Sequence, residues 1–590
     1  MERRSFLQQA GFGAVAVGLM GPHALSRLAG ADPRLGSVSY PDPLGLLTPP
    51  SPSRPFRSVM PGAPTRMIAG YPVAEEFTGD WPGEEVNHPP LEEINAKRTP
   101  DETRDVVVVG GGISGLSAAY LLREHDPVVL EFFPNFGGNA RGEVFSGTPY
   151  SLGGAYIITP DKGTFLDDLY TQLGLPDVVR VDNGPNGDPG ESPVELGGTI
   201  YESGFWDGAY ANDPDVTLAF EKYRQVVLNY TGNYPEIPLP KFGADFVRDL
   251  DTITLKQSIE DGMGVPVPPA LAAAIQAYCY SSFSAGWEEI SAASGWNFLA
   301  AEEFGRWVFP GSNTYIAHAM WEALRAREIQ KNAPGSLLRA GCKVYDVRLE
   351  SKRGSEAGGL VTYADPSGTL RTIRAKRVVM ACQKFVAKYI LKDVGALDAP
   401  KLDAMHTLQY RAYLVANVAL RRQPKRDFYD IFQLANGHDF PTSDAEAEVF
   451  NIPTDVLAGH FAVRGDRRGG VLTFYWPLPW GDSRFRIVEP GVSDVQVDFG
   501  TRLAPHLTAT LGRLGLTPSD VQQVRLTRWG HAMPLSSPRF ISDGHAEHLV
   551  RPFEGAVHFV SQDNWALPAV ENCLLDAEVV AAQIESDLSA

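Results

Sequence analysis

The chain has 590 residues, of which 44% are hydrophobic and 21% are charged, and its formal net charge is −19. At roughly 100–200 residues per domain this length predicts two or more domains, and the ordinary composition excludes a largely disordered chain. The acidic balance argues against nucleic-acid binding, which needs clustered Lys and Arg. The cysteines (Cys279, Cys342, Cys382 and Cys573) have neither disulfide-framework nor zinc spacing, so we expect separate buried thiols and no metal site.

The first 31 residues have the features of an export signal. Arg3 and Arg4 are followed by an apolar run over residues 10–20, and small residues suited to cleavage occur at 29–31. The apolar run is too short to span a membrane, which needs roughly 20 residues. The segment resembles a twin-arginine signal, so we expect the twin-arginine export machinery to deliver the chain to the periplasm or the cell exterior. No later apolar run reaches about 18 residues, so we expect no transmembrane anchor.

Residues 32–100 are rich in Pro, Gly and Ser, as at residues 48–53. Proline fixes φ and removes a backbone donor, so this composition predicts an N-terminal arm or linker and not a core element. Whether part of the arm wraps the folded body stays open.

A strand, a glycine turn, a helix and a second strand follow in order. Residues 106–109 are four consecutive valines, typical of a buried parallel strand, and residues 110–115 read Gly-Gly-Gly-Ile-Ser-Gly. Small and apolar residues then recur at helical spacing over 116–123, and residues 127–131 form a second strand that ends in a carboxylate. This arrangement predicts a dinucleotide-binding unit, because all its parts occur in register.

Each part of the unit has a physical task. Gly110 permits the tight turn, Gly112 lets the backbone approach the pyrophosphate, and Gly115 lets the helix pack against the strand. The helix N-terminus offers free N–H groups to the phosphates. Glu131, 21 residues after Gly110, is placed to accept hydrogen bonds from a ribose diol. At the start of the helix, Ile113 and Ser114 are also expected to contact the cofactor.

Two later glycine pairs favour FAD over a nicotinamide dinucleotide. Residues 136–141 read Phe-Gly-Gly-Asn-Ala-Arg and extend the fingerprint beyond the ribose acid, and residues 152–155 read Leu-Gly-Gly-Ala. The second pair gives close backbone approach, as a flat flavin requires. The cofactor contacts expected from these segments are Gly137, Gly138, Asn139, Arg141, Gly154 and Ala155.

These motifs resemble the flavin amine oxidase and phytoene desaturase superfamily. That superfamily has a Gly-Gly pair, usually followed by Arg, just after the ribose acid. Here Asn139 stands where that Arg is common and Arg141 follows two positions later, a variant most similar to spermidine dehydrogenase-like members. Whether Arg141 or the backbone alone meets the pyrophosphate stays open.

The resemblance implies an α/β fold in which an FAD-binding Rossmann-type domain is assembled from discontinuous segments and joined to an α+β substrate domain. We expect the FAD-binding domain to comprise residues 101–165, 336–392 and 531–590. The substrate domain is expected over residues 166–335 and 393–530.

Several later segments are similar to elements of the superfamily. A Pro-Gly turn at 309–314 precedes a predicted helix over 315–325, and strands are expected at 341–347 and 377–382. By resemblance, the backbone of Val344 lies beside the adenine. Taken singly, each strand is also consistent with an ordinary apolar strand.

The C-terminal segment combines a strand over 557–560, an acid at Asp563 and a helix from about residue 574. In the superfamily this strand, acid and turn lie against the flavin, so Asp563 and Val570 are expected to contact FAD. The usual glycines are absent at residues 569–573, and a plain helix cap is the alternative role for Asp563.

Flavin oxidoreductases move a hydride from a substrate C–H bond to flavin N5, and the protein mainly orients the substrate and excludes water. Superfamily members that act on amines often enclose the substrate nitrogen with aromatic rings. On that resemblance Trp529, His531 and Trp565 are the candidates for the flavin side of the substrate, with structural burial as the alternative for each.

The function favoured by these residues is oxidation of an amine or polyamine by an FAD-dependent oxidase or dehydrogenase. The alternatives are a desaturase or isomerase of a carotenoid or fatty acyl chain, and a flavin-binding protein without turnover. The substrate is expected to be a small molecule, and the sequence leaves the oligomeric state open.

Overall fold

The computed structural model describes residues 56–58, 64–75, 78–79, 89–97, 99–184, 187–188, 190–241, 243–350, 358–435, 446, 452–463, 469–487 and 492–589. The predicted export signal of residues 1–31 lies outside these ranges, so export stays a prediction. None of the helices in the described ranges combines the length and apolar character of a membrane-spanning segment. The four cysteines are free thiols; Cys382 is half-buried and the other three are buried.

A seven-stranded sheet contains every strand that the sequence predicts for the dinucleotide-binding unit. Its order is β14–β6–β5–β17–β16–β15, with β23 beside β17, and β14, β6, β5, β17 and β23 run parallel. The bounds are β5 (Glu102–Val109), β6 (Val128–Leu130), β14 (Leu338–Arg339), β15 (Lys343–Glu350), β16 (Gly358–Ala364), β17 (Leu370–Met380) and β23 (Val557–Phe559). The valines of β5 are buried on both faces, as in a parallel sheet covered on two sides.

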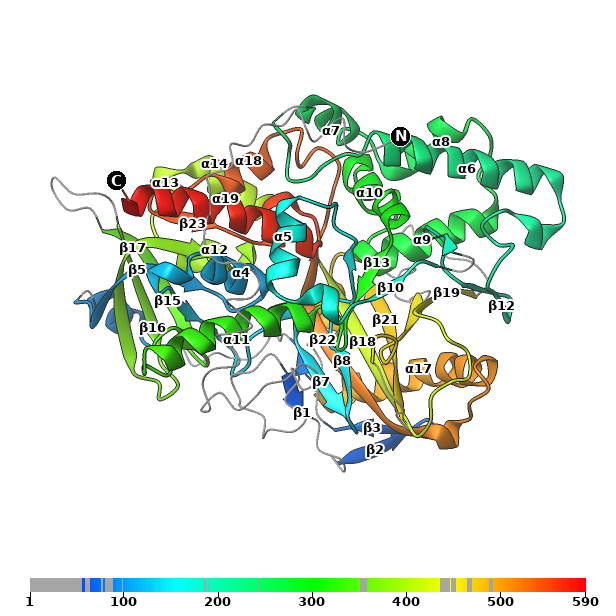
Figure 1. The fold of residues 1–590 in the computed structure, drawn as a ribbon, viewed down its shortest axis with the longest axis horizontal. Coiled ribbons are helices and arrows are strands. Elements are labelled where there is room, and N and C mark those ends of the chain that lie inside the picture. The colour runs from blue at the N-terminus through cyan, green and yellow to red at the C-terminus, as the bar shows by residue number, and fades with distance from the viewer. Residues whose placement is uncertain are drawn as a thin grey trace.

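Three helices pack together on this sheet: α4 (Ile113–Leu121), α11 (Thr314–Gln330) and α19 (Val570–Ser589). Figure 1 shows the red α19 and the blue α4 side by side, with the green α11 below them. The predicted boundary at residue 335 placed α11 in the substrate domain, and this does not match the packing. The chain returns to the first sheet earlier, because α11 buries Ile316 and Met320 in the same core as α4.

A ten-stranded sheet forms the second half of the molecule, in the order β12–β11–β19–β20–β21–β18–β22–β3–β2, with β4 beside β22. The bounds are β2 (Thr65–Ile68), β3 (Tyr71–Ala74), β4 (Thr78–Gly79), β11 (Val194–Leu196), β12 (Thr199–Tyr201), β18 (Tyr410–Leu420), β19 (Asp430–Ala435), β20 (Asp455–Ala458), β21 (Gly470–Leu478) and β22 (Val521–Pro534). Part of the predicted arm is thus a structural element, since β2, β3 and β4 extend this sheet (Figure 1).

Helices cover the two faces of the ten-stranded sheet. On one face lies α17 (Val492–Arg513), where Phe499 packs edge-on against Trp476 of β21. On the other face lies α9 (Pro269–Phe283), where Tyr278 meets Phe432 of β19. The helices grouped with α9 in the upper right of Figure 1 are α6 (Pro214–Gly232), α7 (Ala244–Leu250), α8 (Leu255–Met263) and α10 (Ala292–Leu299).

Short elements complete the described chain. Two three-stranded sheets consist of β1 (Phe56–Ser58), β7 (Gly142–Phe145) and β8 (Thr148–Ser151), and of β10 (Arg180–Asp182), β13 (Arg306–Val308) and β9 (Ile157–Ile158). The remaining helices are α3 (Leu91–Ala96), α5 (Phe165–Gln172), α12 (Lys384–Ile390), α13 (Val394–Leu397), α14 (Ala399–Thr407), α16 (Ser483–Arg486) and α18 (His545–Val550).

Candidate active site

A cavity of about 2760 Å³ extends from the carboxyl ends of β5, β6 and β17 to the face of the ten-stranded sheet that carries α9. Its walls include the glycine turn after β5 at one end and side chains of β18 to β22 at the other. Small-molecule pockets usually have volumes of roughly 300–1,000 Å³. The cavity therefore has room for a dinucleotide and a substrate together.

The glycines of the first turn meet two different demands. A Cβ on Gly115 would lie 1.9 Å from the carbonyl oxygen of Gly110, and a Cβ on Gly110 would lie 2.7 Å from that of Ala381. Gly110 also has a φ of +112°, which favours glycine. A Cβ on Gly112 would meet nothing closer than 3.5 Å, although Gly112 lines the cavity. The chain's own packing thus requires Gly110 and Gly115, whereas Gly112 leaves the space that a closely approaching cofactor needs.

Glu131 is fixed at the end of β6 by the backbone around it. Its carboxylate accepts hydrogen bonds from the N–H groups of Gly111 at 2.6 Å and Phe133 at 2.8 Å. Burial raises the pKa of Glu131, and these N–H donors act in the opposite direction. The carboxylate lines the cavity with lone pairs left for further donors, as ribose hydroxyls would supply.

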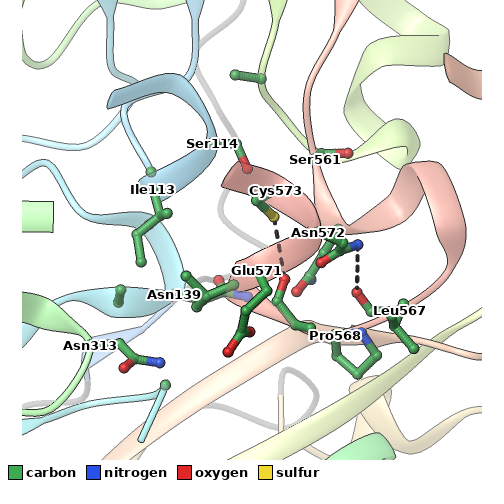
Figure 2. Close-up of a pocket in the computed structure, with 18 of the residues that line it drawn as sticks. Ile113, Ser114, Asn139, Asn313, Ser561, Leu567, Pro568, Glu571, Asn572 and Cys573 are labelled. Atoms are coloured by element: carbon green, nitrogen blue, oxygen red, sulfur yellow. Dashed lines mark hydrogen bonds between the residues drawn. The ribbon is translucent and has the colours of Figure 1, made fainter. Parts of the chain in front are cut away.

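The N-termini of two helices, α4 and α19, lie at this end of the cavity. Ser114 at the start of α4 hydrogen-bonds Cys573 at the start of α19, so the two helix ends are adjacent. Figure 2 shows both ends beside Asn139 and Glu571, which lie around the same opening. Free N–H groups and the partial positive charge of helix N-termini favour phosphate. The geometry therefore fits the pyrophosphate of a dinucleotide.

Two buried amide oxygens on the cavity wall also fit a cofactor. The Oδ1 atoms of Asn313 and Asn572 have no hydrogen-bond partner among the described residues. Their amide nitrogens are engaged, donating to the carbonyls of Tyr156 at 2.9 Å and Leu567 at 3.2 Å. Buried acceptors are rarely left unsatisfied, so both oxygens suit the hydroxyl and N–H donors of a flavin dinucleotide.

Most of the predicted cofactor residues line this cavity. Asn139 donates from Nδ2 to the carbonyl of Ala532 at 3.3 Å, and its own carbonyl would block a Cβ on Gly153 at 2.2 Å. The guanidinium of Arg141 lies over the ring of Trp529 at 5.3 Å. The predicted residues on the cavity wall are Gly110, Gly112, Ile113, Ser114, Glu131, Gly137, Gly138, Asn139, Arg141, Gly154, Ala155, Val344, Val570 and Trp529.

Gly115 and Asp563 are not among the lining residues. Gly115 acts through the packing of α4 on β5, as shown above. The carboxylate of Asp563 is fully buried and accepts hydrogen bonds from the backbone N–H of Lys384 and the hydroxyl of Tyr410, both at 2.6 Å. Asp563 thus caps the start of α12 through Oδ2, while its Oδ1 is buried without a hydrogen-bond partner among the described residues, so contact with FAD stays a prediction.

Two of the three aromatic candidates lie behind the cavity wall. His531 belongs to β22 and stacks on Phe385 with ring centroids 3.6 Å apart, and Phe385 faces the cavity. Burial first, and then the charge of Arg484, lower the pKa of His531 to about 4, so its imidazole is neutral at physiological pH. Trp565 donates from Nε1 to Asp576 at 3.0 Å inside the protein. Neither ring has the position predicted for contact with the flavin.

Trp529 is the aromatic candidate that reaches the cavity. Its Nε1 donates to the carbonyl of Leu152 at 2.7 Å, which fixes the indole beside the Gly153 turn. On β18, Tyr413 is the register partner of Trp529 and also lines the cavity. Together these rings form an aromatic wall where the two ends of the cavity meet.

The far end of the cavity contains carboxylates that sequence reasoning did not select. Glu302, Asp430 and Asp455 line it, and each is less than a tenth exposed. The guanidinium of Arg306 lies 3.4 Å from Glu302 and 3.3 Å from Asp430. Burial raises the pKa of both Asp430 and Asp455. Alternation along the strands was the available signal, but it does not reveal which strands become neighbours.

The described part of the chain contains no cluster of metal ligands. No group of three or more His, Cys, Asp or Glu side chains there could hold an ion. The acids and histidines at residues 543–548, a sequence pattern that could suggest metal ligands, form the start of α18 and the turn before it.

Comparisons with known proteins also indicate a flavin-dependent oxidoreductase. The family of flavin containing amine oxidoreductases matches residues 113–476. Oxidoreductase PigB of Serratia sp. (strain ATCC 39006) is 38% identical over 540 residues, which cover 82% of this chain and 75% of that protein. The flavin-containing amine oxidase of Oncorhynchus mykiss is 52% identical over 62 residues, and this match covers 10% of the chain and only 12% of the trout enzyme.

Solved structures share the fold at low sequence identity. Cyclohexylamine oxidase from Brevibacterium oxydans IH-35A superimposes with a TM-score of 0.58 at 16% identity, covering 83% of this chain and all of that one (100%). Wild-type putrescine oxidase bound to putrescine gives a TM-score of 0.56 at 17% identity, covering 82% and 99%. With the family match over residues 113–476, we conclude that the chain belongs to the flavin-containing amine oxidoreductase family, whose cofactor is FAD.

Proposed function

We propose that this protein is an FAD-dependent oxidase or dehydrogenase of amines. The observation that carries the proposal is the continuity of the cavity. It joins the glycine turn and the two helix N-termini to a far end with the buried carboxylates of Glu302, Asp430 and Asp455. Negative groups of low exposure favour a cationic ligand, because a cation compensates their desolvation.

The reaction follows from amine chemistry. FAD, when bound, supplies the hydride acceptor. The substrate loses a hydride with its electron pair from the carbon next to nitrogen, the nitrogen lone pair forms a C=N bond, and the N–H proton passes to water. Water then converts the imine to a carbonyl compound and releases the nitrogen fragment. The bound cofactor would pass the two electrons of the hydride to an external acceptor such as dioxygen.

The protein's own residues orient the substrate and exclude water. Trp529 and Tyr413 wall the cavity between its two ends, and hydrogen bonds to Leu152 and Ser281 hold their side chains. Rigid rings of this kind restrict the amine to one orientation at low entropic cost. Neutral His531 stacks behind Phe385, which lines the cavity, and is not itself a lining residue.

A desaturase or isomerase of a carotenoid or fatty acyl chain fits the cavity less well. A hydrocarbon placed against Asp430 and Asp455 would leave these buried polar groups without hydrogen-bond partners. Each unpaired group would cost roughly 2–7 kcal/mol of binding free energy. The finer similarity to spermidine dehydrogenases depends on the Gly137–Arg141 motif, and it favours a polyamine among the amines.

Anaerobic reduction of the bound flavin tests the proposal. Purified holoenzyme is mixed with primary alkylamines, α,ω-diamines and, separately, unsaturated fatty acids and carotenoids, and the loss of the oxidised flavin absorbance is recorded. We expect amines to bleach the flavin and lipids to leave it oxidised. Bleaching by the lipids alone would overturn the proposal.

We also propose that the protein is exported by the twin-arginine route. The support is the order of features in residues 3–31, which lie outside the described residues. Replacing both arginines, Arg3→Lys with Arg4→Lys, should retain the protein in the cytoplasm. Undiminished export of this double variant, measured by cell fractionation, would contradict the assignment.

A further inference from the structure

The carboxylates at the far end of the cavity outnumber the positive charge that contacts them. Arg306 is buried and forms ion pairs with Glu302 at 3.4 Å, Asp430 at 3.3 Å and Asp182 at 3.2 Å. Asp455 accepts hydrogen bonds from two neutral hydroxyls, Thr454 at 2.9 Å and Ser281 at 3.0 Å. One guanidinium therefore cannot compensate all of these carboxyl groups in their charged form, and burial raises the pKa of Asp430 and Asp455, so a second cation is needed to hold both charged.

Strand pairing explains why two of these acids face the cavity. In the antiparallel pair β19–β20, Asp430 lies opposite Leu457 and Phe432 lies opposite Asp455. Residues directly opposite each other project from the same face of a sheet, and every second residue shares that face. All four side chains accordingly line the cavity. The two aspartates are thus held by rigid strands and not by loops.

Asp430 presents an unsatisfied oxygen to the cavity. Its Oδ2 accepts from Arg306, but its Oδ1 is buried without a hydrogen-bond partner among the described residues. The residue is only 3% exposed. A buried carboxylate oxygen without a donor is costly, and an ammonium group offers up to three N–H donors with a compensating charge.

Two tyrosines separate these acids from the turn at Gly153 and Gly154. The hydroxyl of Tyr475 donates to the carbonyl of Gly153, and Tyr475 is the register partner of Asp455. On the other side the carbonyl of Tyr156 holds Asn313 beside Gly154, and the hydroxyl of Tyr156 donates to Glu302. The acids therefore lie about one aromatic side chain beyond the turn expected to approach the flavin.

This separation matters because the reacting nitrogen has to be uncharged. Its lone pair forms the C=N bond as the hydride leaves, so a carboxylate that stabilised its ammonium form would oppose the reaction. Fixed carboxylates beyond the tyrosines suit a different nitrogen of the same molecule, one that stays protonated throughout.

We propose that Asp430 and Asp455 bind a second, non-reacting ammonium group of the substrate, which makes the protein selective for diamines or polyamines over monoamines. This inference rests on the proposed amine oxidation. It adds the subsite and the two residues that determine specificity.

The test measures anaerobic flavin reduction by α,ω-diamines and by n-alkylamines of matched length, so that each amine gives a dissociation constant and a reduction rate. In the wild-type holoenzyme we expect the best diamine to bind at least tenfold more tightly than its matched monoamine. Asp430→Asn and Asp455→Asn should each weaken diamine binding about tenfold and change monoamine binding less than about twofold.

A matched control is Asp427→Asn. Asp427 lies three residues before Asp430 but is 72% exposed and pairs with Arg180 at the surface, so its loss should leave the diamine preference unchanged.

A diamine with fully methylated α-carbons has no hydrogen to transfer, and its binding, followed by the flavin difference spectrum, reports the subsite without turnover.

The outcomes separate the two proposals. If no amine reduces the flavin, the proposed function fails. If monoamines bind as well as diamines, or if the Asn variants weaken both equally or neither, the second-ammonium site is wrong while amine oxidation stands. The wild-type comparison requires no variant, so a variant that does not fold leaves this test intact, and Asp430→Glu supplies a charge-preserving check.

Discussion

The two ends of the cavity recognise their ligands by different means. The dinucleotide end uses mainly backbone groups: the turn after β5, the starts of α4 and α19, and the N–H groups that hold Glu131. The far end uses side chains from strands distant in the sequence, such as Asp430, Asp455 and Tyr475.

This difference matches two functions: binding a cofactor that many proteins share, and selecting the substrate of this protein. Backbone N–H groups and helix ends bind phosphate whatever side chains surround them, so that end suits a cofactor shared by many proteins. Side-chain charges on a rigid sheet can change one residue at a time without disturbing the ladder, so the far end suits substrate selection.

The largest expected effect distinguishes two glycines of the turn after β5, Gly115 and Gly112, by what their replacement changes. Gly115→Ala places a Cβ 1.9 Å from the carbonyl of Gly110 and should destabilise the fold by about 3 kcal/mol. Gly112→Ala meets nothing closer than 3.5 Å and should leave the apoprotein stable while weakening FAD binding at least tenfold. Chemical denaturation and FAD titration distinguish the two; equal loss of stability in both variants would contradict the assigned roles. Gly512→Ala, in α17 with nothing within 4 Å of the added Cβ, controls for the replacement of a helical glycine without a clash.

A second prediction concerns the ribose acid. Glu131→Gln keeps the shape but removes the charge and replaces one acceptor with a donor facing the N–H groups of Gly111 and Phe133. We expect FAD to bind about 10–100-fold more weakly, since charged hydrogen bonds contribute roughly 1.5–3 kcal/mol. Glu131→Asp, which keeps the charge, should recover part of the affinity. Unchanged affinity in the Gln variant would exclude Glu131 as a cofactor ligand.

A third prediction compares the two tryptophans. Trp565→Phe removes the hydrogen bond to Asp576 and should cost about 1–2 kcal/mol of folding stability with little change in the rate of flavin reduction. Trp529→Phe removes the bond to Leu152 at the cavity wall and should change the flavin spectrum and the reduction rate. The reverse pattern, measured by denaturation and stopped-flow absorbance, would restore Trp565 as the flavin-facing ring.

The smallest effect is a pH dependence at the far end. Burial raises the pKa of Asp430 from its ordinary value of 3.8 to about 7, so the folded apoprotein holds a proton that the unfolded chain releases between these values. Asp430 therefore contributes stability below pH 3.8 that is lost as the pH rises through about 7. Asp430→Asn should reduce the fall in unfolding free energy between pH 5 and 8 by at least about 1 kcal/mol. An identical pH profile in thermal or chemical denaturation would show that this carboxyl is not perturbed.

The sequence by itself determined the glycine turn and the ribose acid of the dinucleotide end, because these parts are close together in the sequence. The valines of β5, the spacing of Gly110, Gly112 and Gly115, and the acid at Glu131 lie within 26 consecutive residues (106–131), and their conformations follow from steric limits on the backbone. FAD was predicted from the glycine pairs that follow, and the family comparison confirms the cofactor.

Only the tertiary structure decided the far end and the aromatic candidates. Asp430 and Asp455 meet because β19 pairs with β20, and a register choice between strands is not encoded by either strand alone. The same applies to His531 and Trp565, whose sequence positions near the C-terminal segment gave no indication that Phe385 and Asp576 would take up their contacts. Local geometry follows from neighbouring residues, whereas long-range pairing and burial follow from the packing of the whole chain.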